Sequence, residues 1–492
     1  MTKMDFRVNK KLNILYCSPE VTPFSKTGGL GDVAGSLPKA LAGAGCDVRV
    51  ITPKYAGIKE STHKLKKVID SISFKIGKRD ETGSLYEGKL PGSKVPVYFV
   101  SCDKYFVRKE MYQENGKDYE DNLERFSFFS MMVLHSIEKL GWQPDVIHCN
   151  DWQTALIPLY LKTTFKEKKI GTLFTIHNIG YQGLFDKEKL SLTGLDSDIF
   201  NIKGIEYFGK INLLKGGIIF SDIVTTVSPV YSKEIQTKDY GYGLEGVLNE
   251  RSKDLYGIIN GVDYDEWDPS SDNHISVRYS IKSIGRKKGC KKDLQKNCGL
   301  PVTDRPVIGM ISRLDDQKGL DILVEIMDEL MHLDIQMVML GTGKTIFHNI
   351  LKKFKVKYKD KLSVNLFFDN TLAHKIEAGS DLFLIPSKYE PCGLSQLYSF
   401  KYGTVPVAHK TGGLADTITD YTPSTIANNK ATGFLFSHYS PDDLLKAILL
   451  SLSVYEDKKT WKKLVTAGMK SDFSWKRPAK EYVRLYKEVS GG

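Results

Sequence analysis

The first chemistry that this sequence suggests is the binding of a diphosphate. Arg313 and Lys318 lie five residues apart in Ser312-Arg-Leu-Asp-Asp-Gln-Lys-Gly319, which follows an apolar run of strand length. A guanidinium binds phosphate oxygens as a fork and an ammonium binds them as a point charge. Ligands of parallel sheets bind at the carboxyl ends of the strands, where this segment would lie. The pair could therefore clamp a diphosphate, while the simpler alternative is two solvated surface charges.

A carboxylate follows in a second loop of the same half of the chain. Glu390 lies in Pro386-Ser-Lys-Tyr-Glu-Pro-Cys-Gly-Leu394, again after an apolar run. Pro391 and Gly393 shape a turn, and a helix that begins near Leu394 would direct backbone N–H groups at a ligand. A solvated loop glutamate is the simpler interpretation, and a carboxylate that holds sugar hydroxyl groups is the functional one.

Two glycine-pair loops share the sequence Lys-Thr-Gly-Gly-Leu, at residues 26–30 and 410–414. Each lies at a strand-to-helix junction, where unpaired backbone N–H groups and a positive helix end favour phosphate or sugar oxygens. Neither loop is a G-x-G-x-x-G or Walker A sequence, so the signatures of NAD and P-loop binding are missing. Lys26 adds a mobile cation beside the first glycine pair, which favours ligand binding over a purely structural turn.

Alternating strand and helix patterns must position these loops. The predicted strands are 12–17, 48–52, 95–100, 145–148, 172–176, 223–227, 307–311, 336–340, 363–368, 382–385 and 405–408. The predicted helices are 122–140, 319–333, 346–357, 372–378 and 394–402. This alternation predicts an α/β fold with two Rossmann-like, doubly wound parallel sheets that face a central cleft. Residues 263–305, rich in Asp, Ser, Lys and Pro, are interpreted as a linker.

Length and composition limit the class of protein. The 492 residues predict two to four domains, and 41% hydrophobic with 26% charged residues is ordinary globular composition. No apolar run approaches the roughly 18 residues of a membrane span, and the apolar stretch 12–17 is too short for a signal-peptide core. Seven cysteines without a C-x-x-C pair exclude a disulfide framework or zinc knuckle and indicate a reducing compartment. We expect a cytoplasmic location, leave a plastid open, and expect no membrane partner.

The net charge of +11 fits an anionic ligand. The densest basic run, residues 282–296, holds seven Lys or Arg residues against one Asp and contains no aromatic residue. Grooves for single-stranded nucleic acid normally add aromatic residues that stack on bases. We therefore interpret this run as a solvated linker or helix face and expect no nucleic-acid partner. Small anionic substrates such as nucleotide sugars also suit the charge.

A series of longer motifs resembles one enzyme family. In chain order the motifs are K-T-G-G-L-G-D (26–32), H-x-x-D-W (148–152), T-I-H-N (175–178), V-S-P-x-Y (227–231), G-L-E-G-V-L (243–248), N-G-V-D (260–263), S-R-L-x-x-Q-K-G (312–319), E-P-C-G-L (390–394), T-G-G-L-A-D (411–416) and D-F-S-W (472–475). Over about residues 12 to 490 the chain resembles bacterial-type glycogen synthases and plant-type starch synthases, which are retaining glycosyltransferases of the GT-B fold. The resemblance implies an acceptor-side lobe at 1–259, a nucleotide-sugar lobe at 260–471 and a helical strap at 472–492 that crosses back to the first lobe.

The resemblance also implies roles for individual residues. Those implied for the catalytic step are Glu390, Arg313, Lys318, His177 and Asp32. Those implied for binding the donor are Lys26, Gly28, Gly29, Asn260, Phe368, Cys392, Gly393, Leu394, Thr411 and Gly412. Arg313 and Lys318 would neutralise the leaving diphosphate, and Glu390 would hold glucose hydroxyl groups.

The remaining implied roles lie in the first half of the chain. Lys26 and its glycine loop would contact the donor phosphate and the transferred glucose, and Asp32 would face the glucose and the acceptor. His177 would lie near the glucosyl group, and Asp151 belongs to the acceptor-side motif.

Three positions depart from the family pattern. Ser395 stands where Thr is more common, and Lys344 follows Gly-Thr-Gly where an acidic residue is more common. Phe368 stands where related enzymes often carry a Tyr that stacks on adenine. Phe keeps the stacking face and loses the hydroxyl group, which leaves the choice of base open.

The implied reaction moves glucose from ADP-glucose to the 4-hydroxyl at the non-reducing end of an α-1,4-glucan, with retention of configuration. Fixed cations would replace a metal ion, so neither a metal nor another cofactor is expected. Two alternatives remain open: a UDP-glucose-dependent enzyme of the same fold, and a catalytically silent, glucan-binding regulatory relative. The presence of Lys26, Arg313, Lys318 and Glu390 favours an active enzyme.

Overall fold

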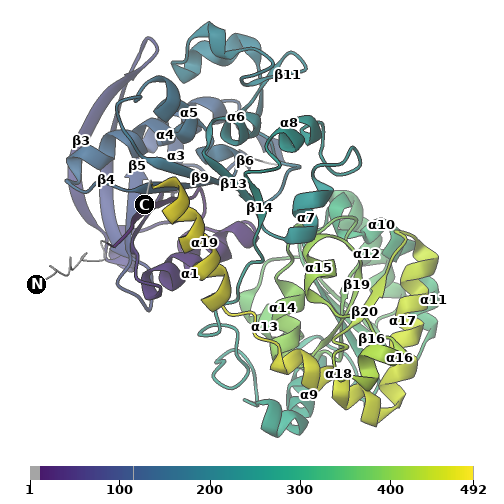
Figure 1. Cartoon of the computed structure of the whole chain (residues 1–492). Coiled ribbons are helices and arrows are strands. Elements are labelled where there is room, and N and C mark those ends of the chain that lie inside the picture. The colour runs from purple at the N-terminus through teal and green to yellow at the C-terminus, as the bar shows by residue number, and fades with distance from the viewer. Residues whose placement is uncertain (1–10, 115, 491–492) are drawn as a thin grey trace, which may run out of the picture. The chain divides into compact units, whose positions relative to one another are not determined.

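The computed structural model describes residues 11–114 and 116–490, which divide into two units with a sheet in each (Figure 1). Unit 1 combines the chain up to Val227 with Ser232–Gly261 and with the chain from Trp475 onward. Unit 2 consists of Ser228–Tyr231 and Val262–Ser474. The changes from one unit to the other therefore fall at 261/262 and 474/475, against the expected 259/260 and 471/472, and a short segment near 230 lies in unit 2.

Unit 1 contains a nine-stranded sheet in the order β14-β13-β9-β8-β1-β2-β5-β4-β3. Its strands are β1 (Asn13–Cys17), β2 (Asp47–Pro53), β3 (Lys66–Ile76), β4 (Arg79–Lys89), β5 (Pro96–Ser101), β8 (Val146–Asn150), β9 (Gly171–Ile176), β13 (Ile223–Thr226) and β14 (Leu255–Gly257). The strands from β14 to β5 run parallel, and the hairpin β3–β4 extends the sheet in the antiparallel sense. The sequence analysis missed this hairpin, because most of its residues are exposed or half-buried and neither strand contains a continuous apolar run.

The helices of unit 1 cover this sheet. They are α1 (Gly29–Gly43), α2 (Glu60–His63), α3 (Asp103–Phe106), α4 (Asn122–Lys139), α5 (Leu156–Thr163), α6 (Leu213–Phe220), α8 (Glu245–Glu250) and α19 (Lys476–Val489), and α7 (Pro229–Glu234) begins in unit 2 and ends in unit 1. Two short antiparallel sheets complete the unit, one with β6 (Gln113–Glu114) and β7 (Lys117–Asp118), the other with β10 (Leu184–Asp186), β11 (Glu206–Tyr207) and β12 (Lys210–Asn212).

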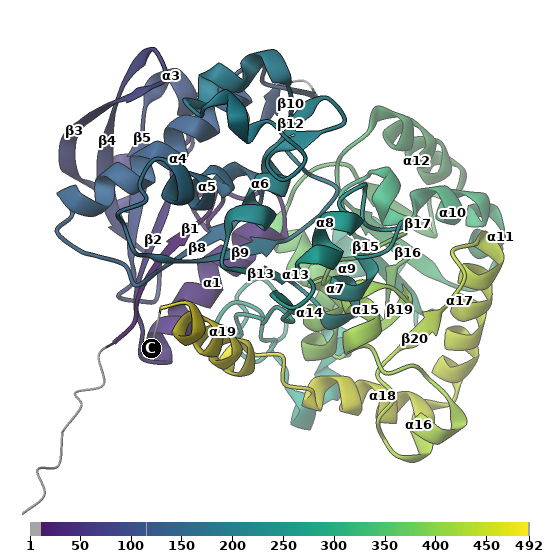
Figure 2. The ribbon, with the colours of Figure 1, turned by 45° about the horizontal axis from the view of Figure 1, so that its top comes forward.

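Helix α19 belongs to unit 1 although it ends the chain. It lies beside α1 (Figures 1 and 2). The Tyr486 hydroxyl lies 2.7 Å from His148 Nδ1 on β8, and both side chains are fully buried. A Cβ atom at Gly171, the first residue of β9, would lie 2.6 Å from the Val489 carbonyl oxygen. The absence of a side chain at Gly171 therefore allows the end of α19 to approach the sheet closely.

Unit 2 contains a six-stranded, entirely parallel sheet in the order β17-β16-β15-β18-β19-β20. Its strands are β15 (Val307–Ile311), β16 (Gln336–Leu340), β17 (Leu362–Asn365), β18 (Leu382–Ile385), β19 (Val405–His409) and β20 (Phe434–Phe436). Its helices are α9 (Lys287–Asn297), α10 (Leu320–Glu325), α11 (Met327–His332), α12 (Thr345–Lys357), α13 (Asn370–Gly379), α14 (Ser395–Tyr402), α15 (Gly412–Thr417), α16 (Pro423–Ala427), α17 (Pro441–Glu456) and α18 (Lys458–Lys470). The prediction of two parallel α/β sheets is confirmed.

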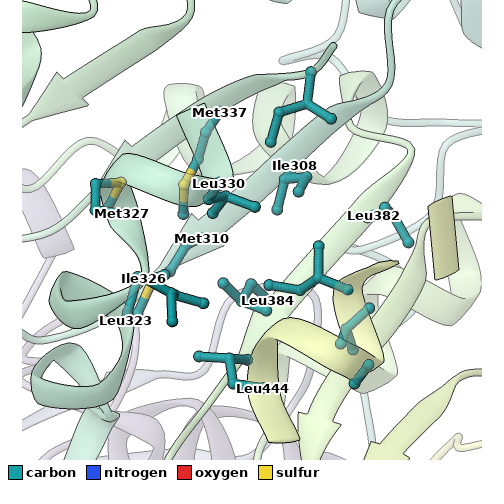
Figure 3. Close-up of a cluster of buried hydrophobic side chains, with 14 of the residues drawn as sticks. Ile308, Met310, Leu323, Ile326, Met327, Leu330, Met337, Leu382, Leu384 and Leu444 are labelled. Atoms are coloured by element: carbon teal, nitrogen blue, oxygen red, sulfur yellow. The ribbon is translucent and has the colours of Figure 1, made fainter. Parts of the chain in front are cut away.

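One face of the unit 2 sheet forms a core of interlocking aliphatic and methionine side chains (Figure 3). Strand residues from β15, β16 and β18 meet helix residues from α10, α11 and α17. The labelled side chains are Ile308, Met310, Leu323, Ile326, Met327, Leu330, Met337, Leu382, Leu384 and Leu444. Burying one such side chain contributes roughly 1.5–3 kcal/mol, so this layer holds the strand ends in fixed positions.

Residues 263–305 are not a linker, and this prediction was wrong. Trp267 stacks between the rings of His374 and Tyr398, with ring centroids 3.8 and 3.9 Å apart. Helix α9 carries most of the basic run, and its Lys291 pairs with Asp381 at 2.7 Å. Lys287 Nζ donates to the Ala378 carbonyl at 2.8 Å, and burial lowers the pKa of this lysine to about 8. The segment is thus part of the packed body of unit 2.

Candidate functional site

Three loops of unit 2 lie at one edge of its sheet. Strands β15, β18 and β19 are neighbours in the sheet, and residues 312–319, 386–394 and 410–414 follow them directly. Parallel strands end at the same edge, so the three predicted site segments come together there. This edge carries the charged residues that the sequence analysis selected in unit 2.

Lys318 and Glu390 form an ion pair at this edge. Lys318 Nζ lies 2.6 Å from Glu390 Oε2, and the Ser387 hydroxyl donates to the same oxygen at 2.9 Å. Only 17% of the lysine side chain and 11% of the glutamate side chain are exposed. A carboxylate this well buried needs charged or hydrogen-bonding partners. Lys318 and Ser387 therefore supply the partners that this buried carboxylate requires.

Arg313 stands closer to solvent than Lys318. Its Nη2 lies 3.4 Å from Asp315 Oδ2, and 44% of its side chain is exposed. Asp315 also caps the short 3₁₀ helix Asp316–Lys318, because its Oδ1 accepts from the Gln317 backbone N–H at 3.1 Å. The loop is thereby fixed while the guanidinium remains accessible to an anion.

Glycines bring the three loops into direct backbone contact. Gly319 has φ +71° and a Cβ atom there would overlap the Pro386 carbonyl oxygen. Gly412 has φ +44°, and its Cβ would overlap the Glu390 carbonyl oxygen. The Gly413 backbone N–H donates to that same carbonyl at 3.1 Å. Left-handed backbone and close approach both demand glycine, so these residues hold the loops together.

Other predicted binding residues of unit 2 share this edge. Cys392 and Thr411 are buried, Gly393 has φ +71°, and Leu394 forms the N-cap of α14. The strand predicted at 363–368 ends at Asn365, so Phe368 lies in the following loop, with 75% of the residue exposed. That loop follows β17, which is parallel to β16 and β15, and Phe368 therefore lies at the same edge as Arg313.

The departure at Lys344 has a structural explanation. Lys344 Nζ forms an ion pair with Asp316 Oδ2, and its backbone N–H donates to the Leu314 carbonyl at 2.8 Å. The loop after β16 thus braces the loop that carries Arg313. A lysine is suited to this position because an aspartate occupies one of the variable positions in S-R-L-x-x-Q-K-G.

The first glycine loop, in unit 1, places Lys26 against Asp32. Lys26 Nζ lies 2.7 Å from Asp32 Oδ1, and Asp32 occupies the first turn of α1, where a negative charge suits the helix dipole. Burial raises the pKa of Asp32, and the Lys26 ammonium opposes this rise. The exposed fractions of the two side chains are 29% and 18%, so the pair faces solvent only in part.

The carboxylate of Glu20 accepts hydrogen bonds from backbone N–H groups of this loop. Its Oε2 accepts from the Thr27 N–H at 2.6 Å and from the Gly28 N–H at 3.3 Å, and its Oε1 accepts from the Tyr112 hydroxyl at 2.9 Å. The expectation of unpaired N–H donors at this loop is therefore wrong for Thr27 and Gly28. Gly29, the first residue of α1, is exposed.

His177 is held as a neutral ring. Its Nε2 lies 2.9 Å from Asn150 Oδ1, and Asn150 Nδ2 donates to the Cys17 carbonyl at 2.9 Å. Because Asn150 presents its oxygen to the imidazole, the ring proton lies on Nε2 and Nδ1 is left as an acceptor. Burial lowers the pKa of His177 to about 3. The ring can therefore exchange hydrogen bonds with a sugar without carrying a charge.

Asp151 adopts a strained backbone next to this ring. Its φ of +57° and ψ of 178° fall in a region that is almost restricted to glycine. Its Oδ1 accepts from the His177 backbone N–H at 2.7 Å, and burial raises the pKa of its carboxyl to about 7. Strain of this kind costs about 1–3 kcal/mol and is concentrated at functional sites.

The predicted residues fall into two sets. Unit 1 carries Lys26, Gly28, Gly29, Asp32, His177 and Asn260, and unit 2 carries Arg313, Lys318, Phe368, Glu390, Cys392, Gly393, Leu394, Thr411 and Gly412. Asn260 is 5% exposed, and its Oδ1 has no hydrogen-bond partner among the described residues. A buried amide oxygen of this kind is a candidate contact for a ligand.

Sequence reasoning missed the residues that support these sets. Glu20, Asn150 and Ser387 each bind a predicted site residue or loop. Asn150 and Ser387 lie inside motifs that the sequence analysis had quoted, so their polar side chains were available signals. Glu20 lies six residues before Lys26, and nothing in that spacing alone indicates its contact with the loop.

Two absences concern only the part of the chain that the structure describes. Within it, no helix combines the length and the apolar character needed to cross a membrane. The same residues contain no group of three or more His, Cys, Asp or Glu side chains arranged to hold a metal ion.

Comparison with known proteins identifies the family. The starch synthase catalytic domain family matches residues 13–250, and the glycosyl transferases group 1 family matches residues 291–468. The glycogen synthase of Fervidobacterium nodosum is 48% identical to this chain, over 97% of it and 99% of the relative. The chain belongs to the glycogen and starch synthase family. The glycogen synthase of Thermotoga maritima, another family member, is 47% identical over 97% of this chain and 99% of its own length.

A solved member of the glycogen and starch synthase family has the same fold. The catalytic domain of starch synthase IV from Arabidopsis thaliana, bound to ADP and acarbose, matches with a TM-score of 0.92 and 34% identity. The match covers 98% of this chain and all of that one (100%). The predicted family, the GT-B fold and the assignment as a glycosyltransferase are thereby confirmed.

Proposed function

We propose that this synthase transfers glucose from ADP-glucose to the 4-hydroxyl at the non-reducing end of an α-1,4-glucan, with retention of configuration. The observation that carries the proposal is the Lys318–Glu390 pair beside Arg313 at the carboxyl edge of the unit 2 sheet. One edge thus offers two cations for a diphosphate and one carboxylate for sugar hydroxyl groups. Relatives named glycogen synthase and a structure solved with ADP support the choice of substrates.

The difficult step is the breaking of the bond between the anomeric carbon and the diphosphate. Positive charge develops on the sugar ring and negative charge on the leaving group. Arg313 and Lys318 stabilise the leaving diphosphate, and because both are already fixed by Asp315 and Glu390, little reorganisation accompanies the reaction. Lys26 adds a further cation for a donor phosphate from the glycine loop of unit 1.

The sugar is held by neutral and negative groups. Glu390 keeps one oxygen on Lys318 and Ser387, which leaves its other oxygen for glucose hydroxyl groups. His177 accepts a hydroxyl hydrogen at Nδ1, since its Nε2 proton is directed at Asn150. The departing phosphate takes the proton of the acceptor hydroxyl on the same face of the sugar, so the reaction uses no protein base.

The donor assay tests this proposal. We expect kcat/KM with glycogen as primer to be much larger for ADP-glucose than for UDP-glucose, with Phe368 stacked on the adenine. The product should be fully digested by an exo-glucanase specific for α-1,4 bonds, and turnover should persist in EDTA because fixed cations neutralise the diphosphate. A large preference for UDP-glucose would overturn the choice of nucleotide. Glucan binding without any glucose incorporation would instead identify a silent regulatory relative.

A further inference from the structure

Unit 1 carries a group of exposed or half-buried apolar side chains, four of them aromatic, that the proposed reaction does not use. This aromatic patch consists of Tyr181, Leu184, Tyr207, Phe208 and Tyr242. Phe208 is 84% exposed, and Tyr181, Leu184 and Tyr242 are 45–47% exposed. The residues come from three segments: the chain around β10, the hairpin β11–β12 and the loop before α8 (Figure 2). Exposed apolar groups of this extent usually mark a binding surface.

Hydrogen bonds fasten the three segments to one another. The Tyr242 carbonyl accepts from the Tyr207 hydroxyl at 2.7 Å and from Gln182 Nε2 at 3.1 Å. Gln182 is 8% exposed, and its Oε1 accepts from Asn212 Nδ2, at the end of β12, at 2.7 Å. The exposed rings therefore stand on a framework whose polar groups are paired.

The backbone holds two of the rings in unfavourable conformations. Phe208 has φ +47° and Tyr242 has φ +50°. A Cβ atom at Gly243 would overlap the Tyr207 hydroxyl oxygen, so this glycine permits the hydroxyl to reach the Tyr242 carbonyl. Aromatic residues at positive φ are strained, and strain of about 1–3 kcal/mol persists where the surroundings fix it, often at binding sites. The rings are thus presented to solvent by a rigid and costly arrangement.

The patch is continuous with the acceptor-side residues of unit 1. Tyr181 lies four residues after His177, and its N–H donates to the Asn178 carbonyl at 3.2 Å. A Cβ atom at Gly183 would lie 2.6 Å from the ring of Trp152, the neighbour of Asp151. The segment that bears the first patch residues therefore packs directly on the acceptor-side motif.

We propose that the aromatic patch binds a stretch of the α-1,4-glucan acceptor away from its reacting end. Flat rings match the C–H faces of glucose units, and tyrosine hydroxyl groups can bond to sugar hydroxyls. The charged side chains on the same strands, Lys210 and Asp186, offset each other, with Lys210 Nζ 3.7 Å from Asp186 Oδ1, and this surface therefore suits a neutral polymer. The inference rests on the proposed function, because it takes the acceptor glucan as its ligand.

Replacement of Phe208 tests the patch directly. In native gels that contain glycogen, Phe208→Ala should bind roughly three- to tenfold more weakly than the unaltered protein, as expected for the loss of one aromatic contact. Phe208→Leu, which keeps apolar area without a ring, should weaken binding to a similar extent, and Phe208→Tyr should restore it. Ile202→Ala removes a neighbouring 80%-exposed aliphatic side chain and should leave mobility unchanged.

Kinetics with acceptors of different length provide a second readout. Phe208→Ala should raise KM for glycogen and leave the KM for ADP-glucose and the turnover of maltotriose unchanged. Equal retardation of Phe208→Ala and the unaltered protein in the gels that contain glycogen would overturn the proposal. So would light scattering that shows the unaltered protein as a dimer and Phe208→Ala as a monomer, because the patch would then join two copies of the chain.

The two proposals fail in different ways. Lys318→Ala, which lacks a residue placed at the donor site, should still be retarded by glycogen to the same extent as the unaltered protein. If the patch proposal alone is wrong, Phe208→Ala will be retarded normally while glucose transfer to glycogen proceeds. If the chain does not use a glucan at all, glycogen will retard neither protein, and the donor assay will show no incorporation.

Discussion

The same five residues, Lys-Thr-Gly-Gly-Leu, form a loop in each unit, and in both loops backbone N–H groups donate hydrogen bonds to a glutamate. In unit 1 the loop N–H groups of Thr27 and Gly28 are bound by the side-chain carboxylate of Glu20. In unit 2 the N–H of Gly413 is bound by the backbone carbonyl of Glu390. The carboxylate of Glu20 is therefore occupied by its loop, whereas that of Glu390 remains available to Lys318, Ser387 and a substrate.

The first glycine of each loop also differs between the two units, both in its backbone conformation and in the space around it. Gly28 has φ −158°, and a Cβ atom there would have no neighbour within 4 Å. Its counterpart Gly412 has φ +44°, and a Cβ would overlap the Glu390 carbonyl. The first loop opens onto space that a ligand can enter, and the second is packed against the turn that carries the carboxylate. Identical local sequence thus serves ligand access in one unit and loop packing in the other.

The largest effect that follows from this comparison concerns Lys318. Lys318→Ala should lower kcat by roughly a hundredfold or more, since removal of one preorganised group at developing charge costs about 3–4 kcal/mol. The matched control is Lys410→Ala, which removes an exposed lysine from the second glycine loop and should leave kcat within about twofold. Steady-state kinetics with saturating ADP-glucose would measure both. Equal losses in the two variants would contradict the assignment of Lys318.

The next largest effect separates the two glycines. Gly412→Ala should lower the free energy of unfolding by roughly 2–4 kcal/mol, because it adds positive-φ strain and a clash with the Glu390 carbonyl. Gly28→Ala should leave stability within about 0.5 kcal/mol and act only on donor binding. Thermal unfolding followed by circular dichroism measures the difference, at about 2–4 °C per kcal/mol for a unit of this size. A larger loss of stability in Gly28→Ala than in Gly412→Ala would contradict the roles assigned to the two loops.

Glutamine substitutions sharpen the contrast between the two glutamates. Glu20→Gln should lower the free energy of unfolding by about 1–3 kcal/mol. One of the groups that donate a hydrogen bond to the Glu20 carboxylate would then face the NH₂ group of the glutamine. Glu390→Gln keeps a hydrogen-bond acceptor but loses the charge opposite Lys318, so it should lower kcat with a smaller change in Tm. Activity and thermal unfolding need to be measured on both variants. The comparison fails if Glu20→Gln mainly lowers kcat and Glu390→Gln mainly lowers Tm.

The smallest expected effect, when taken over a single pH unit, is a pH dependence at Asp151. Burial raises the pKa of this carboxyl to about 7 in the folded chain, above its ordinary 3.8. Between these values the folded state keeps a proton that the unfolded state releases, so this group makes stability fall as pH rises, by at most about 1.4 kcal/mol per pH unit. Asp151→Asn removes the titration and should gain stability relative to the unaltered protein from pH 5 to pH 7. Denaturant midpoints at the two pH values give the result, and a constant difference would rule out the raised pKa.

How much the sequence predicted depends on the range of the contacts involved. Continuous apolar runs such as 307–311 and 382–385 predicted the parallel strands, because burial on both faces leaves a local pattern. The hairpin β3–β4 and helix α9 escaped prediction, since their exposed charged residues hide the buried positions. Motif spacing placed Lys318 and Glu390 after neighbouring strands, but their pairing across 72 residues is set by the sheet order. The contact of Glu20 with its loop could not be predicted either, because it depends on the conformation of the turn between Glu20 and Thr27.

Helix α19 ties the first half of the chain to its last residues, and this has a consequence for synthesis on the ribosome. Unit 1 cannot bury Tyr486 against His148 until Val262–Ser474 have been translated. At about 5–20 residues per second, these 213 residues (474 − 262 + 1) take roughly ten to forty seconds. During that time the nascent first half lacks the helix that covers β8 and α1, while unit 2 emerges with all of its strands in sequence. Unit 2 is therefore able to finish folding first, although it is made second.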